Sequence, residues 1–257
     1  MVSTTTLVRR PSPRLGDGIV THIQRTPVDV TRAFEQWEAY VQVLRNAGWT
    51  VVEVPEAPAC PDSAFVEDTV VMYRNLAVIC RPGADERRPE IDDVGAVVDG
   101  LGCSIDRIRS PGTLDGGDVL KVGDTVYVGR GGRTNDEGIG QLRAILGPLG
   151  ATVVAVPLTK VLHLKSAVTA LPDGTIIGYP PLIDDASVFP TFLAVPEEAG
   201  AHVVLLDDRR LLMAADAPRS AQLFRDLGYD PIEVDIGEFI KLEGCVTCLS
   251  VRIRHPD

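Results

Sequence analysis

The sequence contains few aromatic residues, few histidines and no long apolar segment. Aromatic residues make up 5% of its 257 residues, and there are four histidines. Its apolar stretches are short and bounded by charges, as at 203–206, whereas a membrane-spanning helix needs roughly 18 to 20 apolar residues. The N-terminal segment MVSTTTLVRRPSPR also lacks the apolar stretch of a secretory signal peptide. We therefore expect a cytoplasmic protein with no membrane partner.

Positive charge is scarce as well. Lysine and arginine total 25 against 36 acidic residues, which gives a net charge of −11. This balance disfavours a broad phosphate-binding surface, so we expect no nucleic-acid partner. Five cysteines are an odd number, and a chain that is 45% hydrophobic can bury a core without disulfides. We expect Cys60, Cys80 and Cys103 to be buried as small apolar side chains.

One pattern recurs along the chain: an amphipathic stretch, a glycine and a short β-branched run. It is clearest at Gly48, Gly102, Gly150 and Gly228, with a weaker copy at Gly200. Glycine readily adopts the left-handed conformation that follows the last turn of a helix, and β-branched runs favour strands. Each unit is predicted to contain about two strands, a helix and another strand. Five such units fit the chain, although an ordinary α/β sheet alternates helices and strands in the same way.

Chemically unusual side chains follow these glycines at a nearly constant distance. Asp62, Asp115, His163 and Glu243 stand 13 to 15 residues after the four clearest glycines. If a pseudo-rotation axis relates the units, positions of equal phase converge at one end of that axis. The sequence thus favours a propeller-like fold with a central site.

Cys248, His163 and Asp115 have the side chains that a cysteine nucleophile requires. A base or cation must stabilise the thiolate, and a third group must orient that partner. Asp115 has an alternative interpretation, because an aspartate in a turn such as LDGGD often accepts hydrogen bonds from its own backbone. The remaining histidines are weaker candidates: His22, which is undecided, His202, which has no polar cluster beside it, and His255, which we expect to be frayed.

Cys245 and Cys248 form a Cys-x-x-Cys pair, which has two other interpretations. A zinc site would require two more ligands, and the sequence offers no second cysteine pair and no histidine pair at ligand spacing. A thioredoxin-type redox pair usually opens a helix after an early strand, whereas this pair lies close to the C-terminus. We therefore expect neither a metal site nor a thioredoxin-type motif.

Acidic residues cluster in the segment PDSAFVED. If this segment is a strand, Asp62 and Asp68 lie on one face, while Phe65 and Glu67 project from the other. Clustered acids suit a ligand cation with several N–H groups, although a solvated turn has the same composition. Two arginines in glycine-containing loops are candidates to bind a ligand carboxylate through forked hydrogen bonds: Arg87 and Arg133.

Together these motifs resemble the dimethylarginine dimethylaminohydrolases, a family of the guanidino-group-modifying superfamily. The matching segments occur in order along nearly the whole chain: FVEDTVV, RPGADERRPE, TLDGGDVL, VYVG with GRTN, LHLKS and TCLSVRI. LHLKS with LDGGD and a C-terminal Cys-Leu-Ser is a specific combination, whereas FVED alone is not. The resemblance implies a five-bladed α/β-propeller, the pentein fold, with pseudo-symmetric ββαβ units around a central active site. It also implies one catalytic domain over residues 1–257.

The resemblance implies a role for each matching residue. Cys248, and not Cys245, matches the nucleophile; His163 matches the catalytic histidine, and Asp115 matches its acidic partner. The other candidates would line or support the substrate site: Asp68 for the guanidinium, Asp62 for the α-amino group, Glu67 and Phe65 beside them, Arg87 and Arg133 for the carboxylate, Glu243 where the family often has Asp, and Ile19 in the lid LGDGI.

The implied reaction is hydrolysis of an Nω-methylated arginine to citrulline and a methylamine. The Cys248 thiolate adds to the guanidinium carbon, and His163 protonates the departing amine and then activates water. The expected ligand is a small guanidino amino acid; no metal or organic cofactor is expected, and a homodimer is compatible with the sequence. Arginine deiminases typically have His-x-Asp, whereas the third position here is Lys165, which favours methylated substrates.

Two other classes of function remain open. One is another guanidine hydrolase of the same fold, such as an arginine deiminase, and retention of both candidate clamp arginines disfavours a substrate without a carboxylate. The other is a non-catalytic binding protein, such as the ribosome anti-association factors that share this architecture. The net charge of −11 and the combination of Cys, His and acid disfavour that second class.

Overall fold

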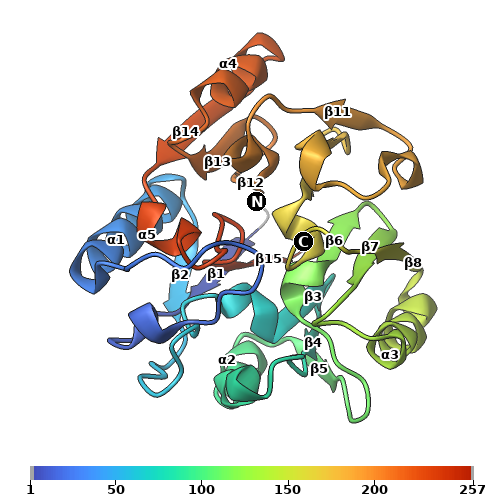
Figure 1. The fold of residues 1–257 in the computed structure, drawn as a ribbon. Helices are drawn as coiled ribbons and strands as arrows, with labels where there is room; N and C mark the ends of the chain where they lie inside the picture. The colour runs from blue at the N-terminus through green and yellow to red at the C-terminus, as the bar shows by residue number, and fades with distance from the viewer. Residues whose placement is uncertain (1–2, 256–257) are drawn as a thin grey trace.

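The computed structural model describes residues 3–255, which form five three-stranded sheets around one axis (Figure 1). From the axis outward, the sheets are β15 (Val251–His255), β1 (Ser3–Val8) and β2 (Thr50–Glu53); β3 (Val70–Tyr73), β4 (Leu76–Ile79) and β5 (Ser104–Arg107); β6 (Val119–Val122), β7 (Thr125–Arg130) and β8 (Thr152–Pro157); β9 (Val168–Ala170), β10 (Ile176–Gly178) and β11 (Phe192–Ala194); and β12 (Val203–Leu205), β13 (Arg210–Ala214) and β14 (Asp230–Val234).

All five sheets share one pairing pattern. The inner and middle strands are antiparallel, and the middle and outer strands are parallel. An α-helix joins the parallel strands in four blades: α1 (Val30–Asn46), α2 (Val94–Gly100), α3 (Asp136–Leu146) and α4 (Pro218–Asp226). In the blade of β9, β10 and β11, the 3₁₀ helices Pro180–Leu182 and Ala186–Val188 take that place. The predicted five-bladed α/β-propeller is confirmed, with one blade that lacks its α-helix.

The four clearest glycines of the repeat adopt the conformation that the sequence predicts. Gly48, Gly102, Gly150 and Gly228 have φ between 77° and 92°, at the junction between a helix and the next strand. The prediction that the fifth glycine, Gly200, ends a helix in the same way was wrong. Gly200 lies in the 3₁₀ helix Glu198–Ala201 before β12, and a Cβ atom there would meet the Ser220 side chain at 2.1 Å. Close packing, and not helix termination, explains this glycine.

The ring is closed by strands from the two ends of the chain. β15 pairs antiparallel with β1, and Ser3 lies opposite His255 in this register, so the expected fraying at His255 was wrong for its backbone. Five hydrophobic clusters fill the junctions between neighbouring blades. Among residues 3–255, no helix combines the length and the apolar character that crossing a membrane requires.

The inner strands β3, β6, β9, β12 and β15 all start at the same end of the axis. The segments that precede four of them contain Asp68, Asp115, His163 and Cys248. Pseudo-symmetry therefore places these side chains, which are far apart in sequence, around one point.

Candidate active site

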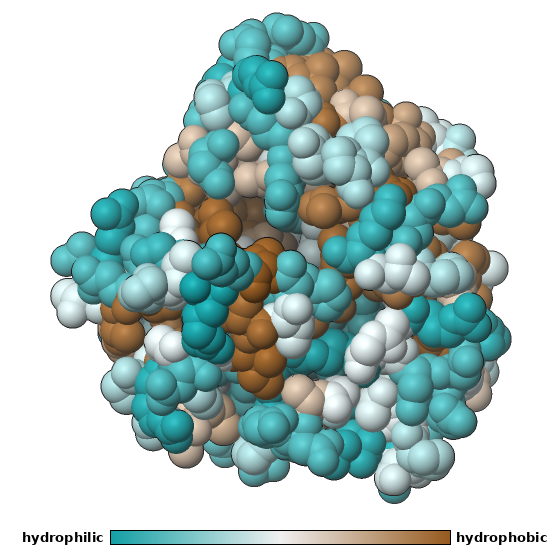
Figure 2. Space-filling model, in the orientation of Figure 1, coloured by the Kyte–Doolittle hydropathy of each residue, from teal (hydrophilic) through white to brown (hydrophobic). Residues whose placement is uncertain are grey.

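A small cavity lies at the amino ends of the inner strands. Figure 2 shows that the same face of the molecule is hollowed near its middle. Nine residues that the sequence singled out line the cavity: Ile19, Asp62, Phe65, Asp68, Arg87, Arg133, His163, Glu243 and Cys248. Two further lining residues, Leu242 and Gly244, flank Glu243 in the LEG segment, and Leu162 precedes His163.

The segment PDSAFVED is not a strand. It consists of turns followed by the 3₁₀ helix Val66–Thr69 (η2), so the alternation of side chains expected for a strand does not apply. Asp62 and Asp68 do reach the same cavity, but Phe65 joins them there. Phe65 is buried edge-to-face against Phe239, with 6.1 Å between ring centroids. This turn therefore supplies two acids and one apolar wall to the cavity.

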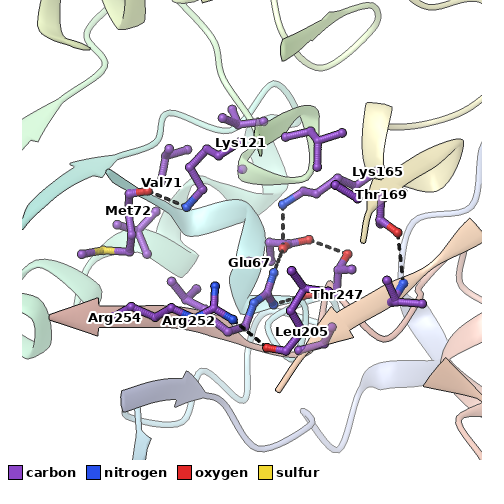
Figure 3. A pocket seen from close by; sticks show the side chains of 18 residues that line it. Glu67, Val71, Met72, Lys121, Lys165, Thr169, Leu205, Thr247, Arg252 and Arg254 are labelled. Atoms are coloured by element: carbon purple, nitrogen blue, oxygen red, sulfur yellow. Dashed lines mark hydrogen bonds and ion pairs between the residues drawn. The ribbon is translucent and has the colours of Figure 1, made fainter. Parts of the chain in front are cut away.

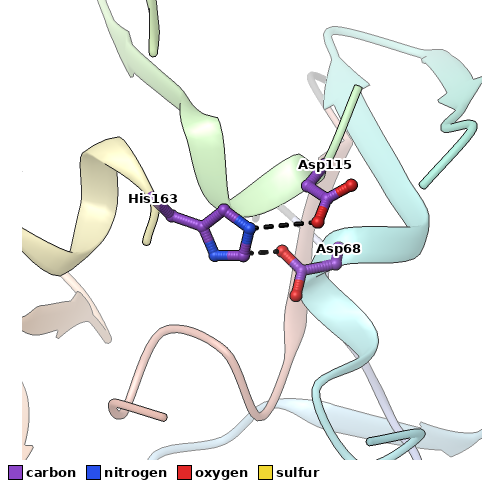
Figure 4. A group of neighbouring side chains, drawn as sticks. All are labelled: Asp68, Asp115 and His163. Atoms are coloured by element: carbon purple, nitrogen blue, oxygen red, sulfur yellow. Dashed lines mark hydrogen bonds and ion pairs between the residues drawn. The ribbon is translucent and has the colours of Figure 1, made fainter. Parts of the chain in front are cut away.

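His163 lies between two buried carboxylates (Figure 4). Its Nε2 is 3.0 Å from Oδ2 of Asp115, and its Nδ1 is 3.8 Å from Oδ1 of Asp68. Burial alone would lower the pKa of His163, but the charge of Asp68 and the hydrogen bond with Asp115 outweigh it and raise the pKa to about 9. His163 is therefore an imidazolium at neutral pH.

The same charges act on Asp68 in return. Burial alone would raise the pKa of this carboxyl group, but the charges of His163 and Arg87 hold it well below its usual range. Asp68 also accepts hydrogen bonds from Arg87 Nη1 at 2.6 Å and from the Gly117 N–H at 2.8 Å. Asp68 is thus an ionised carboxylate in a fixed orientation.

Asp68, Asp115 and His163 have potential ligand atoms within 4.8 Å of one another, which is close enough to bind a metal ion. In the protonated state, however, His163 offers N–H donors and no free lone pair to a metal. A metal ion would have to displace that proton. The arrangement fits an acid–base group held between two anions more closely than a metal centre.

The double glycine of LDGGD allows close backbone packing at this point. A Cβ atom on Gly116 would lie 2.0 Å from the Glu67 carbonyl oxygen, and one on Gly117 would lie 2.6 Å from both Asp68 and His163. Asp115 accepts from the Gly83 N–H at 2.9 Å as well as contacting His163. It therefore connects separate loops and does not merely stabilise its own turn.

Asp118, the last residue of LDGGD, was missed at the level of sequence. It accepts hydrogen bonds from Thr134 Oγ1 at 2.6 Å and from the Leu164 N–H at 3.0 Å, which fixes the loop that carries His163. Burial raises the pKa of Asp118 to about 6. Its signal was the second acid of the motif, which sequence alone could not distinguish from an ordinary turn residue.

The two candidate clamp arginines differ in how many donors they have available. Arg87 donates to Asp68, to Glu90 and to the Phe65 carbonyl oxygen, so the protein itself occupies most of its guanidinium. Arg133 contacts Asp115 at 3.4 Å through Nη1 alone, and it lines the cavity. Arg133 therefore has more donors free for a ligand than Arg87.

The two cysteines of the Cys-x-x-Cys pair are in contact, with 3.4 Å between their Sγ atoms. Cys248 lines the cavity with His163, whereas Cys245 lines a separate pocket on the other side of the turn. The hydrogen bond with Cys245, burial and the nearby carboxylates together raise the pKa of Cys248. These surroundings favour the thiol of Cys248 over its thiolate before a substrate binds.

The predicted lid covers the cavity and is held from both sides. The Ile19 N–H donates to Asp62 at 3.1 Å, and the N–H groups of Thr21 and His22 donate to Glu243 at 2.8 and 2.5 Å. Glu243 has φ of 62°, an uncommon value for a residue other than glycine, and this backbone places its carboxylate under the lid. His22, undecided from sequence, follows the predicted lid in the chain, contacts Glu243 and does not line the cavity that holds Cys248.

Glu67 faces away from the cavity, toward the interior of the axis. It pairs with Lys165 at 2.6 Å and with Arg252 at 2.7 Å, and it accepts from Thr247 Oγ1 at 2.9 Å. Lys165 likewise faces the axis and is absent from the cavity lining. These residues brace the loops of the site from behind.

No family model matches the chain, but similar proteins identify its family. The chain is 65% identical over 255 residues to N(G),N(G)-dimethylarginine dimethylaminohydrolase of Streptomyces coelicolor, with 99% of each chain covered. It is 35% identical to the enzyme of the same name from Pseudomonas aeruginosa, with 96% of this chain and 98% of that one covered. The chain belongs to the dimethylarginine dimethylaminohydrolase family.

Solved structures of dimethylarginine dimethylaminohydrolases have the same fold. A cysteine-to-serine variant from P. aeruginosa, complexed with citrulline, superposes with a TM-score of 0.91 at 34% identity and covers 98% of this chain and all of that one. A histidine-to-glycine variant of a dimethylarginine dimethylaminohydrolase, in an adduct with S-methyl-L-thiocitrulline, also gives 0.91 at 33% identity, with 98% of this chain and all of that one covered.

Proposed function

We propose that this protein hydrolyses Nω-methylated L-arginine to L-citrulline and dimethylamine or methylamine. The observation that carries the proposal is the cavity in which Cys248, the imidazolium of His163 and the carboxylate of Asp68 meet. Membership of the dimethylarginine dimethylaminohydrolase family supports the same reaction class, a hydrolase acting on a C–N bond of a guanidine.

Complementary charges orient the substrate in this cavity. Asp68 is ionised and faces the cavity beside His163, so it is the acceptor for the guanidinium. At the lid end, Asp62 receives the α-amino group, and Arg133 supplies free donors for the α-carboxylate. Arg87 acts mainly by fixing Asp68 through their 2.6 Å ion pair.

The substrate cation prepares the nucleophile. The hydrogen bond with Cys245, burial and nearby carboxylates raise the pKa of Cys248, and a bound guanidinium favours the thiolate by opposing the charge of those carboxylates. The thiolate attacks the guanidinium carbon, and the C–N bond to the methylated nitrogen then breaks. The departing amine takes its proton from His163, which leaves a covalent S-alkylthiouronium on Cys248.

Hydrolysis of this intermediate uses the same histidine as a base. His163, now neutral, takes a proton from water as the water attacks the thiouronium carbon. Cleavage of the C–S bond then releases citrulline and returns the thiolate, and the hydroxyl proton of the adduct passes to solvent. Nδ1 of His163 is the nitrogen that exchanges the proton. Nε2 is hydrogen-bonded to Asp115, whereas the 3.8 Å between Nδ1 and Asp68 is too long for a hydrogen bond.

Selectivity for methylated arginine follows from the absence of an acidic side chain at position 165, which is a lysine. Lys165 pairs with Glu67 outside the cavity, so this position provides no acceptor for the N–H groups that methylation removes. Comparable turnover of free arginine would contradict this part of the proposal.

The test is citrulline release from asymmetric dimethylarginine, monomethylarginine, arginine and agmatine, measured in parallel. We expect release from the methylated arginines, no release in Cys248→Ser, and nearly full activity in Cys245→Ser. Activity that survives in Cys248→Ser but is lost in Cys245→Ser would show that the wrong cysteine was assigned. Preferential release from arginine would instead indicate a deiminase of the same fold.

A further inference from the structure

The interior of the propeller contains a second polar cavity, separate from the one that holds Cys248 (Figure 3). It has a volume of about 150 Å³ and is lined by residues of all five inner strands. We call it the axial cavity. The catalytic residues precede these strands, whereas the axial cavity extends along them toward their carboxyl ends, so the two cavities occupy different levels of the axis.

Four cationic side chains line the axial cavity: Lys121, Lys165, Arg252 and Arg254. Of the described residues that line it, Glu67 alone is acidic. Glu67 uses one oxygen, Oε1, for both Lys165 and Arg252. Lys121 and Arg254 are therefore left without a carboxylate partner in this lining, in a chain whose net charge is −11.

The remaining cations are held in position by neutral acceptors. Lys121 Nζ donates to the Met72 carbonyl oxygen at 2.5 Å, and Arg254 Nη2 donates to the Leu205 carbonyl oxygen at 2.7 Å. The Arg254 guanidinium also lies 5.4 Å from the centre of the Trp49 ring. These contacts fix the geometry of the cations but leave their charge unneutralised.

The nearest further acids do not cancel this charge. Asp124 pairs with Arg74 at 3.3 Å, and Asp208 acts on Arg254 from outside the lining. Limited solvation of its ammonium group, together with the charges of Lys165 and Arg252, lowers the pKa of Lys121, which shows mutual repulsion within the group. An anion that enters the cavity would relieve that repulsion.

We propose that the axial cavity is a binding site for a multivalent phosphate-type oxyanion. Two guanidinium groups supply the planar donor forks that match phosphate oxygens, and two ammonium groups supply further charge. Four cationic side chains against the single carboxylate of Glu67 suit a multivalent anion, such as inorganic phosphate or pyrophosphate. Glu67 lines this site and precedes Asp68 in the chain. An anion bound in the axial cavity would therefore lie directly behind the loop that carries Asp68, the proposed acceptor for the guanidinium.

The experiment measures binding of inorganic phosphate and pyrophosphate to the purified full chain. Isothermal titration and the thermal unfolding midpoint are followed at constant ionic strength, with sodium chloride as the balancing salt. We expect saturable binding and an unfolding midpoint that rises with the logarithm of phosphate concentration, more strongly for pyrophosphate. Chloride alone producing the same rise would overturn the proposal, because simple screening would then account for it.

Two variants locate the bound anion. Lys121→Gln and Arg254→Gln should each weaken phosphate binding about tenfold, since each removes one charge-assisted contact. The matched control is Lys160→Gln, because Lys160 also donates to a carbonyl oxygen, that of Ile183, but lies outside the axial cavity. The control should bind phosphate like the wild-type chain. If one cavity variant fails to fold, the other still provides the test.

The active-site cavity is the competing location, since it contains Arg133. Phosphate binding that is abolished by Arg133→Ala and unaffected by Lys121→Gln would place the anion beside Cys248 and refute the axial site. Binding that survives Arg133→Ala and weakens in Lys121→Gln supports it.

Discussion

The two ends of the propeller axis contain opposite chemistry made from neighbouring residues. Asp68 faces the active-site cavity and Glu67 faces the axial cavity; Cys248 faces the first and Thr247 the second. At one end a cation, the His163 imidazolium, lies between carboxylates, and at the other a carboxylate lies among cations. In this fold, the cavity that a side chain faces determines its function, so residues adjacent in sequence can have entirely different functions.

The pair Cys248 and Thr247 should give the largest contrast between the two ends. Cys248→Ser should lower kcat by on the order of 10⁴-fold or more, because it removes the nucleophile. Thr247→Val should leave kcat within about threefold and destabilise the fold by about 1 kcal/mol, since Glu67 loses a hydrogen bond. Citrulline assays and urea unfolding of both variants test this, and a catalytic defect of similar size in Thr247→Val would break the comparison.

The adjacent acids should separate catalysis from stability. Asp68→Asn should reduce kcat/KM by about 10²-fold, the equivalent of one charge-assisted hydrogen bond to the guanidinium. Glu67→Gln should instead destabilise the fold by about 3 kcal/mol, because Lys165 and Arg252 lose their charge partner inside the protein. Measuring both quantities for both variants is decisive: if Glu67→Gln folds as well as wild type but loses substrate binding, Glu67 belongs to the substrate site.

The raised pKa of His163 should make stability depend on pH. Its value of about 9 in the fold exceeds the ordinary 6.5, so the folded protein binds more protons than the unfolded chain between these values. The resulting stabilisation, about 3 kcal/mol, is fully present below pH 6.5 and is lost as pH rises through 9. Urea unfolding from pH 6 to 10 should show this decline in wild type and a flatter profile in His163→Gln; parallel profiles would exclude an imidazolium.

The lid contact of Glu243 should have the smallest effect. Glu243→Gln removes one of two acceptor oxygens for the Thr21 and His22 N–H groups, so KM should rise about threefold to tenfold with little change in kcat. Glutamine is the suitable replacement because it keeps the size of the side chain and the backbone at φ of 62° while it removes the charge and one acceptor oxygen. Glu137→Gln on the exposed face of α3 serves as the control, and an unchanged KM in Glu243→Gln would show that the lid is held elsewhere.

Residue spacing predicted the centre of the site well. A glycine that ends each helix sets the phase of the following loop, so Asp62, His163 and Glu243 could be expected to converge before any contact was known. The grouping of Cys248 with His163 in one cavity also followed from residue type, because few alternatives exist in a chain with four histidines. Local backbone geometry and chemical scarcity are both properties that sequence expresses directly.

The side chains around that centre were harder to predict. Glu67 was expected at the substrate, but a 3₁₀ helix replaces the expected strand and directs it toward Lys165. Asp118 could not be distinguished from an ordinary turn residue, because its partners Thr134 and Leu164 are set by tertiary packing. Likewise the blade around β10 has no α-helix, since only the paired strands are needed to close the ring. Which way a side chain faces in an irregular loop depends on contacts that local sequence does not encode.

The single-residue alternation at 67–68 and 247–248 has a consequence for how such a protein can vary in length. Deletion or insertion of one residue in either loop would exchange the group that faces the substrate with the group that faces the interior. These loops should therefore accept substitutions more readily than changes of length. The connection between β10 and β11 contains two short 3₁₀ helices and contributes no residue to the active-site cavity. Changes of length should therefore be tolerated best in this connection.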